Sequence, residues 1–377
     1  MLESLLKFAV DPGAEQHLRR QIDLHKTAVL ASAGRGAVAD VADAEQAARA
    51  DPGGAFTFDR DGRATLTTDR RTWDAGRFEL LSIGELRRRA SMTHVPGTEA
   101  RLWILEGMSP VTDIGSLQAT TSDALFQVAS QFNCLESPGP YVTPVSDYFL
   151  DSTQGPRAAI SAFPGTLLRH YAAPDMHSGR FVQATDARQI NLLSAISGPH
   201  LPRVQNGYLN AAHVTDPRTL ATALESQFDA IQVGVHADVQ VALGYDWDGR
   251  VEDSERRRIA QVYTSTLAGG ASPILAPVCR QLLRAAYLGT LLATAILGRK
   301  RAVLTLIGGG VFGNPVALIW EAIFWALNEA KPFLAYDLDV IVNSRTPVPR
   351  EETLEPLRGR YEAWLAFTRD GGLEIIR

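Results

Sequence analysis

The stretch AVLTLIGGGVFGNP, residues 302–315, decides how the rest of the chain is interpreted. An apolar run leads directly into Gly308, Gly309 and Gly310, and Asn314 and Pro315 follow after three further residues. An apolar run that ends in glycines predicts a buried strand followed by a tight turn. Asn caps the free amides of a helix and Pro fits its first turn, so a helix is predicted from residue 315 onward.

The glycine-rich turn is a candidate anion-binding site. Glycine tolerates positive φ, and successive backbone amides in such a turn converge on an anion at the start of a helix. Gly308, Gly310 and Gly313 satisfy the dinucleotide spacing G-x-G-x-x-G, but they lie too close to the C-terminus for a full βαβ unit to follow. The Gly-Lys-Ser/Thr of a P-loop is missing too. A tight turn without any ligand remains the alternative.

Outward from this stretch, apolar strand-like and amphipathic helix-like segments alternate. Strands are predicted at 101–105, 124–129, 259–267, 301–307 and 338–343, and residues 231–235 and 239–243 are predicted to form one strand or two short ones. Helices are predicted at 155–171, 186–196, 217–230, 278–297 and 315–330, and Asp216-Pro217 is a start signal for the third. This alternation predicts an α/β fold, a three-layer α/β/α arrangement around a mixed sheet. Polar helical segments at 40–50 and 83–90 predict a helical extension or lid at 1–95, ahead of a core domain at 96–377.

Composition narrows the classes of partner. The 377 residues carry a net charge of −5, so no global positive field favours nucleic acid or an anionic membrane. The basic run Arg87, Arg88 and Arg89 is interpreted as a solvated helix face. Two cysteines do not suggest a disulfide framework or a zinc site, and no cofactor motif is found. The N-terminus lacks the features of a signal peptide, so we expect a cytoplasmic protein, with delivery as an effector left open.

Several segments resemble the macrodomain family, whose members bind ADP-ribose. Residues 304–315 look like the second phosphate loop of that family, and residues 123–133 look like a diverged form of the strand that ends in an Asn-rich turn. Asp113-Ile114 resembles the motif whose acid holds adenine, although Thr112 replaces its glycine. The resemblance implies a macrodomain-like sheet with the ligand at the carboxyl ends of its strands.

A longer ordered set of motifs is similar to the MavL-like branch of macrodomains, which removes ADP-ribose from arginine. These motifs are YFLDSTQGPR (148–157), RHY (169–171), QIN (189–191), VGVHAD (233–238) and QVYTS (261–265). The resemblance covers roughly residues 80–345 and implies ADP-ribose or an ADP-ribosylated protein as the partner. The net charge adds the expectation of no nucleic acid and no membrane partner.

The resemblance also implies a set of ligand-binding residues. Asp113 would contact adenine and Asn133 the distal ribose, and Asp151 is either an acid of the site or an anchor for its loop. The first phosphate loop would contain Thr153, Gln154 and Gly155, and the second Gly308, Gly309, Gly310, Val311, Phe312, Gly313 and Asn314.

Cleavage of an ADP-ribosyl–arginine bond requires a carboxylate to activate water or to stabilise the developing oxocarbenium ion. Asp238 interrupts an apolar strand and is the first candidate, with Asp246 second and Asp248 in the same cluster. Replacing Asp238 by Ala is expected to abolish hydrolysis and preserve binding. Two other interpretations stay open: a reader that binds ADP-ribose without cleaving it, and a hydrolase of a free NAD-derived nucleotide.

Overall fold

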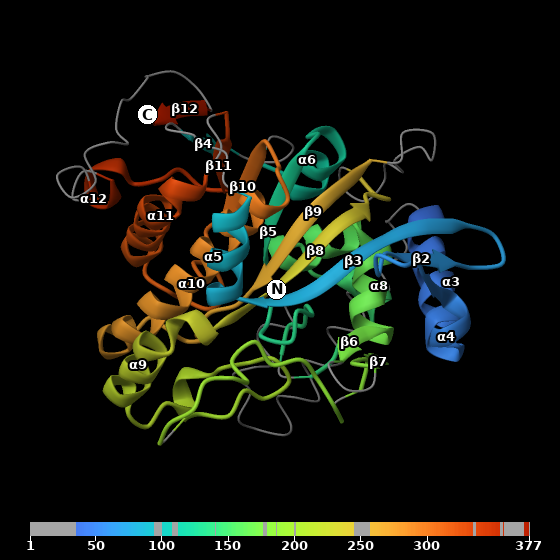
Figure 1. Ribbon diagram of the computed structural model, residues 1–377, viewed down its shortest axis with the longest axis horizontal. Helices are drawn as coiled ribbons and strands as arrows, with labels where there is room; N and C mark the ends of the chain where they lie inside the picture. The colour runs from blue at the N-terminus through green and yellow to red at the C-terminus, as the bar shows by residue number, and fades with distance from the viewer. Residues whose placement is uncertain are drawn as a thin grey trace.

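The computed structural model describes residues 35–93, 100–107, 112–139, 141–175, 179–185, 187–199, 201–244, 257–334, 337–354, 357 and 373–376. Ten strands of this described part form one mixed sheet in the order β1-β2-β3-β8-β9-β5-β10-β11-β4-β12 (Figure 1). A separate small hairpin pairs β6 (Ala173–Asp175) with β7 (Gly179–Phe181).

The centre of the sheet is parallel. Five neighbouring strands run in one direction: β9 (Arg258–Thr264), β5 (Ala124–Ala129), β10 (Arg301–Thr305), β11 (Asp339–Ser344) and β4 (Arg101–Glu106). The antiparallel β12 (Leu373–Ile376) closes that side of the sheet. Because parallel strands end at the same edge, the loops after β5, β9, β10 and β11 are brought together.

The N-terminal strands extend the opposite side of the sheet. β1 (Phe56–Phe58), β2 (Ala64–Thr67) and β3 (Thr72–Ser82) form an antiparallel meander, and β3 pairs with β8 (Gln232–Gln240). The segment expected to be a helical extension therefore contains three strands of the main sheet. The described helices of this segment are α3 (Arg35–Ala50), the short α4 (Pro52–Ala55) and α5 (Ile83–Met92). Pairing with a strand far along the chain stabilises β3, and a local pattern does not reveal such a partner.

Helices cover both faces of the sheet, as the three-layer prediction required (Figure 1). One layer contains α5, α9 (Pro217–Ser226), α10 (Ala276–Ile296) and α11 (Val316–Ala330). The other contains α3, α6 (Ile114–Thr120), α7 (Gln154–Ser161) and α8 (Phe163–Tyr171), with the short η1 (Val145–Leu150) beside α3. The fully buried Tyr287 of α10 and Trp320 of α11 belong to the core between the first layer and the sheet. None of the helices described is long and apolar enough to cross a bilayer.

Three helix predictions had different outcomes. α9 begins as predicted, because the Asp216 side chain accepts the amides of Arg218 and Thr219, each at 3.1 Å. The helix expected over 155–171 is divided into α7 and α8, because Ala162 leaves helical geometry ahead of Pro164. The helix predicted over 186–196 is wrong for the described residues 187–196, which form loops and turns.

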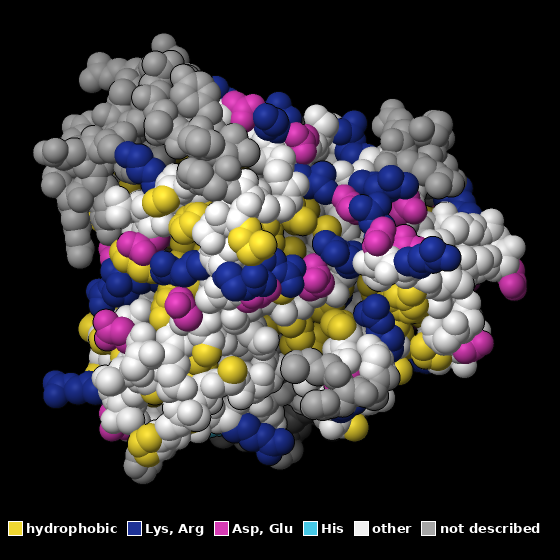
Figure 2. Space-filling view, in the orientation of Figure 1, with side chains coloured by type: hydrophobic (Ala, Val, Ile, Leu, Met, Phe, Trp, Pro, Cys, Tyr) yellow, Lys and Arg dark blue, Asp and Glu magenta, His cyan; other side chains and the backbone are white. Residues whose placement is uncertain are grey.

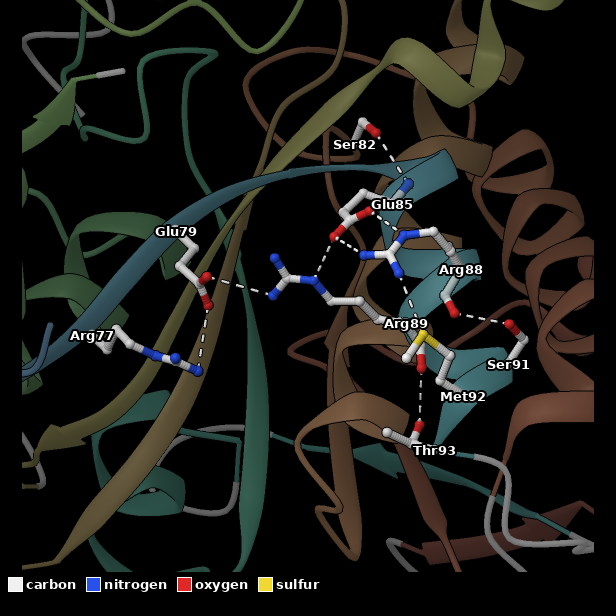
Figure 3. Close-up of polar contacts among 9 residues, drawn as sticks. All are labelled: Arg77, Glu79, Ser82, Glu85, Arg88, Arg89, Ser91, Met92 and Thr93. Carbon is white, nitrogen blue, oxygen red and sulfur yellow. Dashed lines mark hydrogen bonds and ion pairs between the residues drawn. The ribbon is translucent and has the colours of Figure 1, made fainter. Parts of the chain in front are cut away.

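Charges on the surface are mixed. Side chains of both signs are interspersed on the face in Figure 2. In the predicted basic run, Arg88 and Arg89 both bind Glu85, at 2.8 and 2.7 Å (Figure 3). Arg87 contacts Asp229 and Glu329. Carboxylates therefore offset the positive charges of these three arginines, which do not form a free basic patch.

Candidate functional site

A cavity of about 400 Å³ lies at the carboxyl edge of the parallel strands. Its walls include the last residues of β5, β10 and β11 and both of the turns singled out in the sequence. The first turn contributes Asp151, Thr153, Gln154 and Gly155, and the second contributes Gly308, Gly309, Gly310, Val311 and Phe312. The structure thus brings together two segments that are about 150 residues apart in the chain.

The first turn presents backbone amides at the start of α7. Thr153 is the N-cap in extended geometry, and its side chain does not cap the helix. The amides of Gln154 and Gly155 lie in the first helical turn and have no acceptor within the helix. The side chain of Gln154 is already engaged with β5, because it accepts the Ala129 amide at 3.0 Å and donates to the Gln127 carbonyl at 3.1 Å. A ligand would therefore meet the backbone of this turn.

The second turn depends on glycine at its first position. Gly308 has a φ of +75°, and a Cβ there would lie 2.4 Å from the Thr266 methyl group. The amides of Gly310 and Val311 find no acceptor among the residues that the structure describes. Gly310 and Val311 line the same cavity as Gln154 and Gly155 of the first turn, and unpaired amides around one cavity suit an anion.

Asn314 has a different role from the predicted helix cap. α11 begins one residue later than expected, at Val316, with Pro315 in the cap position and no side-chain cap. The buried Asn314 side chain instead accepts the Thr266 hydroxyl at 3.1 Å and donates to the Leu267 carbonyl at 2.9 Å. Asn314 thereby connects the glycine turn to the loop after β9. Neither Asn314 nor Gly313 lines the cavity.

Glu136 is a cavity residue that the sequence analysis missed. It is 1% exposed, and its Oε1 atom has no hydrogen-bond partner among the described residues. A Cβ on Gly155 would lie 2.4 Å from Glu136 Oε2, so the carboxyl packs directly against the first turn. Burial raises the pKa of the Glu136 carboxyl well above its ordinary value, the buried Arg169 opposes this shift, and nearby Asp151 adds to it.

The remaining charged groups of the described lining are Asp151 and Arg345. Asp151 is half-buried, and its Oδ1 accepts the Thr153 amide at 2.9 Å, as expected for an acid that anchors the loop. The exposed Arg345 follows β11 and donates to the Ser152 carbonyl at 2.9 Å. A guanidinium at this position can pair with an anion that enters the cavity. Among the described residues there is no group of three His, Cys, Asp or Glu side chains that could hold a metal ion.

Two predicted ligand residues, Asn133 and Asp113, make hydrogen bonds to other residues of the protein. Asn133 is 2% exposed, accepts the Leu135 amide and donates to Gln189 at 2.8 Å. Asp113 caps α6 through the Ser116 amide and binds buried Arg157 at 2.7 Å, next to a separate, much smaller pocket. Neither side chain lines the main cavity, so the adenine and ribose contacts predicted for them stay predictions.

The structure does not bring Asp238 to the cavity. Asp238 lies at the bulge of β8, with φ of +58°, and pairs with Arg299 at 2.5 Å and Arg63 at 3.2 Å. Arg299 also approaches Asp123, at the amino end of β5, whereas the cavity is at the carboxyl end. Asp238 therefore lies at the opposite end of the strands from the cavity, and its catalytic role stays a prediction. Asp246 and Asp248 lie outside the described residues.

Comparisons with known proteins give only distant structural similarities. No family model matches the chain, and no curated protein matches it. The chain is similar to the crystal structure of poly(ADP-ribose) glycohydrolase from Thermomonospora curvata, with 15% identity, a TM-score of 0.44, and coverage of 87% of this chain and 99% of the other. A second structure of that enzyme, bound to the inhibitor ADP-HPD, gives 14% identity, a TM-score of 0.43, and coverage of 86% and 99%.

The glycohydrolase from Deinococcus radiodurans in complex with ADP-ribose gives 13% identity, a TM-score of 0.40, and coverage of 76% of this chain and 94% of the other. Similarity at this level transfers no residue role to this chain. Any function assigned to the chain therefore depends on the contacts within the cavity.

Proposed function

We propose that the cavity binds ADP-ribose and that the protein hydrolyses an ADP-ribosyl bond, as a macrodomain-type enzyme of the MavL-like branch. The observation that carries the proposal is the meeting of two amide-presenting turns and a fully buried carboxyl in one cavity. The preferred substrate is an ADP-ribosyl group on an arginine side chain, in keeping with the sequence motifs of that branch.

The diphosphate would lie between the two turns. The amides of Gln154 and Gly155 would bind it from one side and those of Gly310 and Val311 from the other, with Arg345 at the rim. Such amide cradles favour an anion without any metal ligand. Phe312, whose ring lies 5.6 Å from that of Tyr208, would pack against the distal ribose.

Two carboxyls with different surroundings suit glycosidic hydrolysis. The reaction breaks the bond between the anomeric carbon and the leaving nitrogen, forms a bond to a water oxygen, and moves one proton from that water to the leaving group. The raised pKa of the Glu136 carboxyl favours its protonated form, so Glu136 would donate a proton to the leaving nitrogen and regain one from the attacking water. The more exposed Asp151 would stabilise the positive charge that develops at the ribose.

The test combines binding and turnover. Isothermal titration calorimetry with ADP-ribose is expected to give saturable heat, and protein carrying arginine-linked ADP-ribose is expected to release free ADP-ribose. Replacing Glu136 by Gln is expected to preserve binding and lower the turnover number roughly 10²- to 10⁴-fold, the usual contribution of a general acid.

Gly310→Val is the matched variant for binding. A Cβ at Gly310 meets nothing within 4 Å, so a side chain there fills the cavity without straining the protein. We expect unchanged thermal stability and loss of the ADP-ribose heat. Binding without turnover on arginine, serine and acidic linkages would instead identify a reader. An absence of heat at millimolar ADP-ribose would refute the proposal as a whole.

A further inference from the structure

Helix α3 contributes one buried carboxylate to a distant part of the chain. Glu45 is 4% exposed, and its two oxygens accept the amides of Val145 and Ser146, both at 2.8 Å. Oε1 also accepts the hydroxyl of Tyr171 of α8 at 2.9 Å, and Arg49 binds the same tyrosine. Hydrogen bonds to an ionised carboxylate are about twice as strong as those between neutral groups.

The two amides that Glu45 binds open η1. The N-cap of η1 is Pro144, which provides no side-chain cap, so the first amides of this segment have no local acceptor. Glu45 supplies the missing acceptor from a helix that lies 100 residues earlier in the chain. A negative charge at the start of a helical segment is also favoured by the alignment of its peptide dipoles.

η1 carries the contacts that position both carboxyls of the cavity. The Tyr148 hydroxyl accepts the Glu136 amide at 2.9 Å and hydrogen-bonds with His170 at 2.9 Å. η1 ends at Leu150, and its C-cap residue Asp151 lines the cavity. Displacement of η1 would therefore move the backbone anchor of Glu136 and the position of Asp151 together.

We propose that α3 is part of the frame of the ligand site and that Glu45 is its positioning residue. Glu45 fixes η1, and η1 fixes Glu136, Asp151 and the first amide-presenting turn. The inference rests on the proposed function for the nature of the ligand. It gives α3 the role of a brace on one wall of the cavity.

The test separates positioning from general stabilisation. Glu45→Gln keeps one acceptor oxygen and Glu45→Ala keeps none, so we expect a graded loss of ADP-ribose affinity that reaches roughly tenfold for Ala. Val41→Ala is the matched control. It lies on the same helix, is fully buried, and leaves a cavity in the core without removing the hydrogen bonds from Glu45 to η1. It is expected to lower the melting temperature and leave affinity within about twofold.

Hydrogen exchange on the ligand-free protein gives a second readout. Peptides covering residues 136–151 are expected to exchange faster in both Glu45 variants and at the native rate in Val41→Ala. Equal losses of affinity in Val41→Ala and the Glu45 variants, or unchanged exchange over 136–151, would overturn the inference. If the native protein does not bind ADP-ribose, the proposed function fails, and the exchange data alone decide whether Glu45 positions this wall.

Discussion

Arg169 is the one positive charge in a buried polar cluster that also contains His170 and His236. Arg169 is fully buried; it donates to the Cys134 carbonyl at 2.9 Å and to His236 at 3.0 Å, and its guanidinium stacks on Tyr263 at 3.6 Å. Burial, together with the positive charge of Arg169, lowers the pKa of His170 to about 3. Burial and the same cation hold the pKa of His236 well below its ordinary value. Both histidines are therefore neutral in the folded protein near neutral pH.

Neutral buried histidines make the protein sensitive to acid. The pKa of His170 is about 3 in the folded state and 6.5 in the unfolded state. Between these two pH values the unfolded state binds a proton that the folded state does not, so the free energy of unfolding falls as the pH drops from 6.5 toward 3. By pH 5 the loss from one such histidine is about 2 kcal/mol. The free energy of unfolding is measured by urea titration at pH 7 and at pH 5. Between these pH values, His170→Gln is expected to lose about 2 kcal/mol less of this free energy than the native protein. The exposed His213→Gln is the control, and a loss as large as the native one in His170→Gln would contradict this account.

Replacement by Ala is expected to have different effects on stability at Gly155 and at Gly310. A Cβ at Gly155 would lie 2.1 Å from the Ala129 carbonyl oxygen and 2.4 Å from Glu136, whereas a Cβ at Gly310 meets nothing within 4 Å. Gly155→Ala is therefore expected to lower the free energy of unfolding by about 1–3 kcal/mol through overpacking. Gly310→Ala is expected to change it by less than about 0.5 kcal/mol. Denaturant titration of both variants checks the contrast, which similar values would exclude.

At the scale of elements, the sequence predicts what local chemistry determines. The Asp216 cap and the Gly308 turn were predictable because the deciding residues are neighbours in the chain. The prediction over 186–196 failed because distant partners hold that backbone: the Ile190 amide donates to the Gln183 side chain, and the Leu192 amide donates to the Phe132 carbonyl. Glu136 was missed for the same reason, since its burial depends on α7 and on the end of β5.

The loop that carries the glycine turn is fastened by Asn314. Asn314→Ala removes the hydrogen bonds to Thr266 and Leu267 and leaves buried polar groups without partners. We expect a loss of about 1–3 kcal/mol in the free energy of unfolding, together with weaker ADP-ribose binding. Asp216→Ala, which removes the cap of α9, is expected to cost about 1 kcal/mol without changing affinity. Native affinity in Asn314→Ala would show that the turn keeps its shape without this anchor.

At the scale of the whole molecule, the two edges of the sheet have different roles. The carboxyl edge holds the cavity, and the opposite edge holds the ion pairs of Asp238 with Arg299 and Arg63. These pairs join the β1–β2 turn to β8 and to the residues that precede β10. No local feature of the sequence distinguishes an acid at one edge from an acid at the other, because the direction of each strand is set by its pairing.

Asp238→Asn tests this assignment of edges. Asn tolerates the left-handed backbone at this position, and the partly exposed ion pairs contribute about 0–1 kcal/mol. We therefore expect near-native stability, ADP-ribose binding and turnover. Calorimetry and release of ADP-ribose from arginine-modified protein measure these quantities. A loss of turnover comparable to that of Glu136→Gln would return Asp238 to the reaction and refute the placement of the active carboxyls at the carboxyl edge of the sheet.

The pairing of β3 with β8 has a consequence for synthesis on the ribosome. The Ala75 carbonyl of β3 meets the His236 ring, a residue that is translated 161 positions later. Until β8 emerges, this inner side of β3 has no partner, and a long strand with open amides and carbonyls is prone to join other chains. Nascent chains that stop short of residue 240 should therefore aggregate or be captured by chaperones, while chains that include β8 can close the sheet.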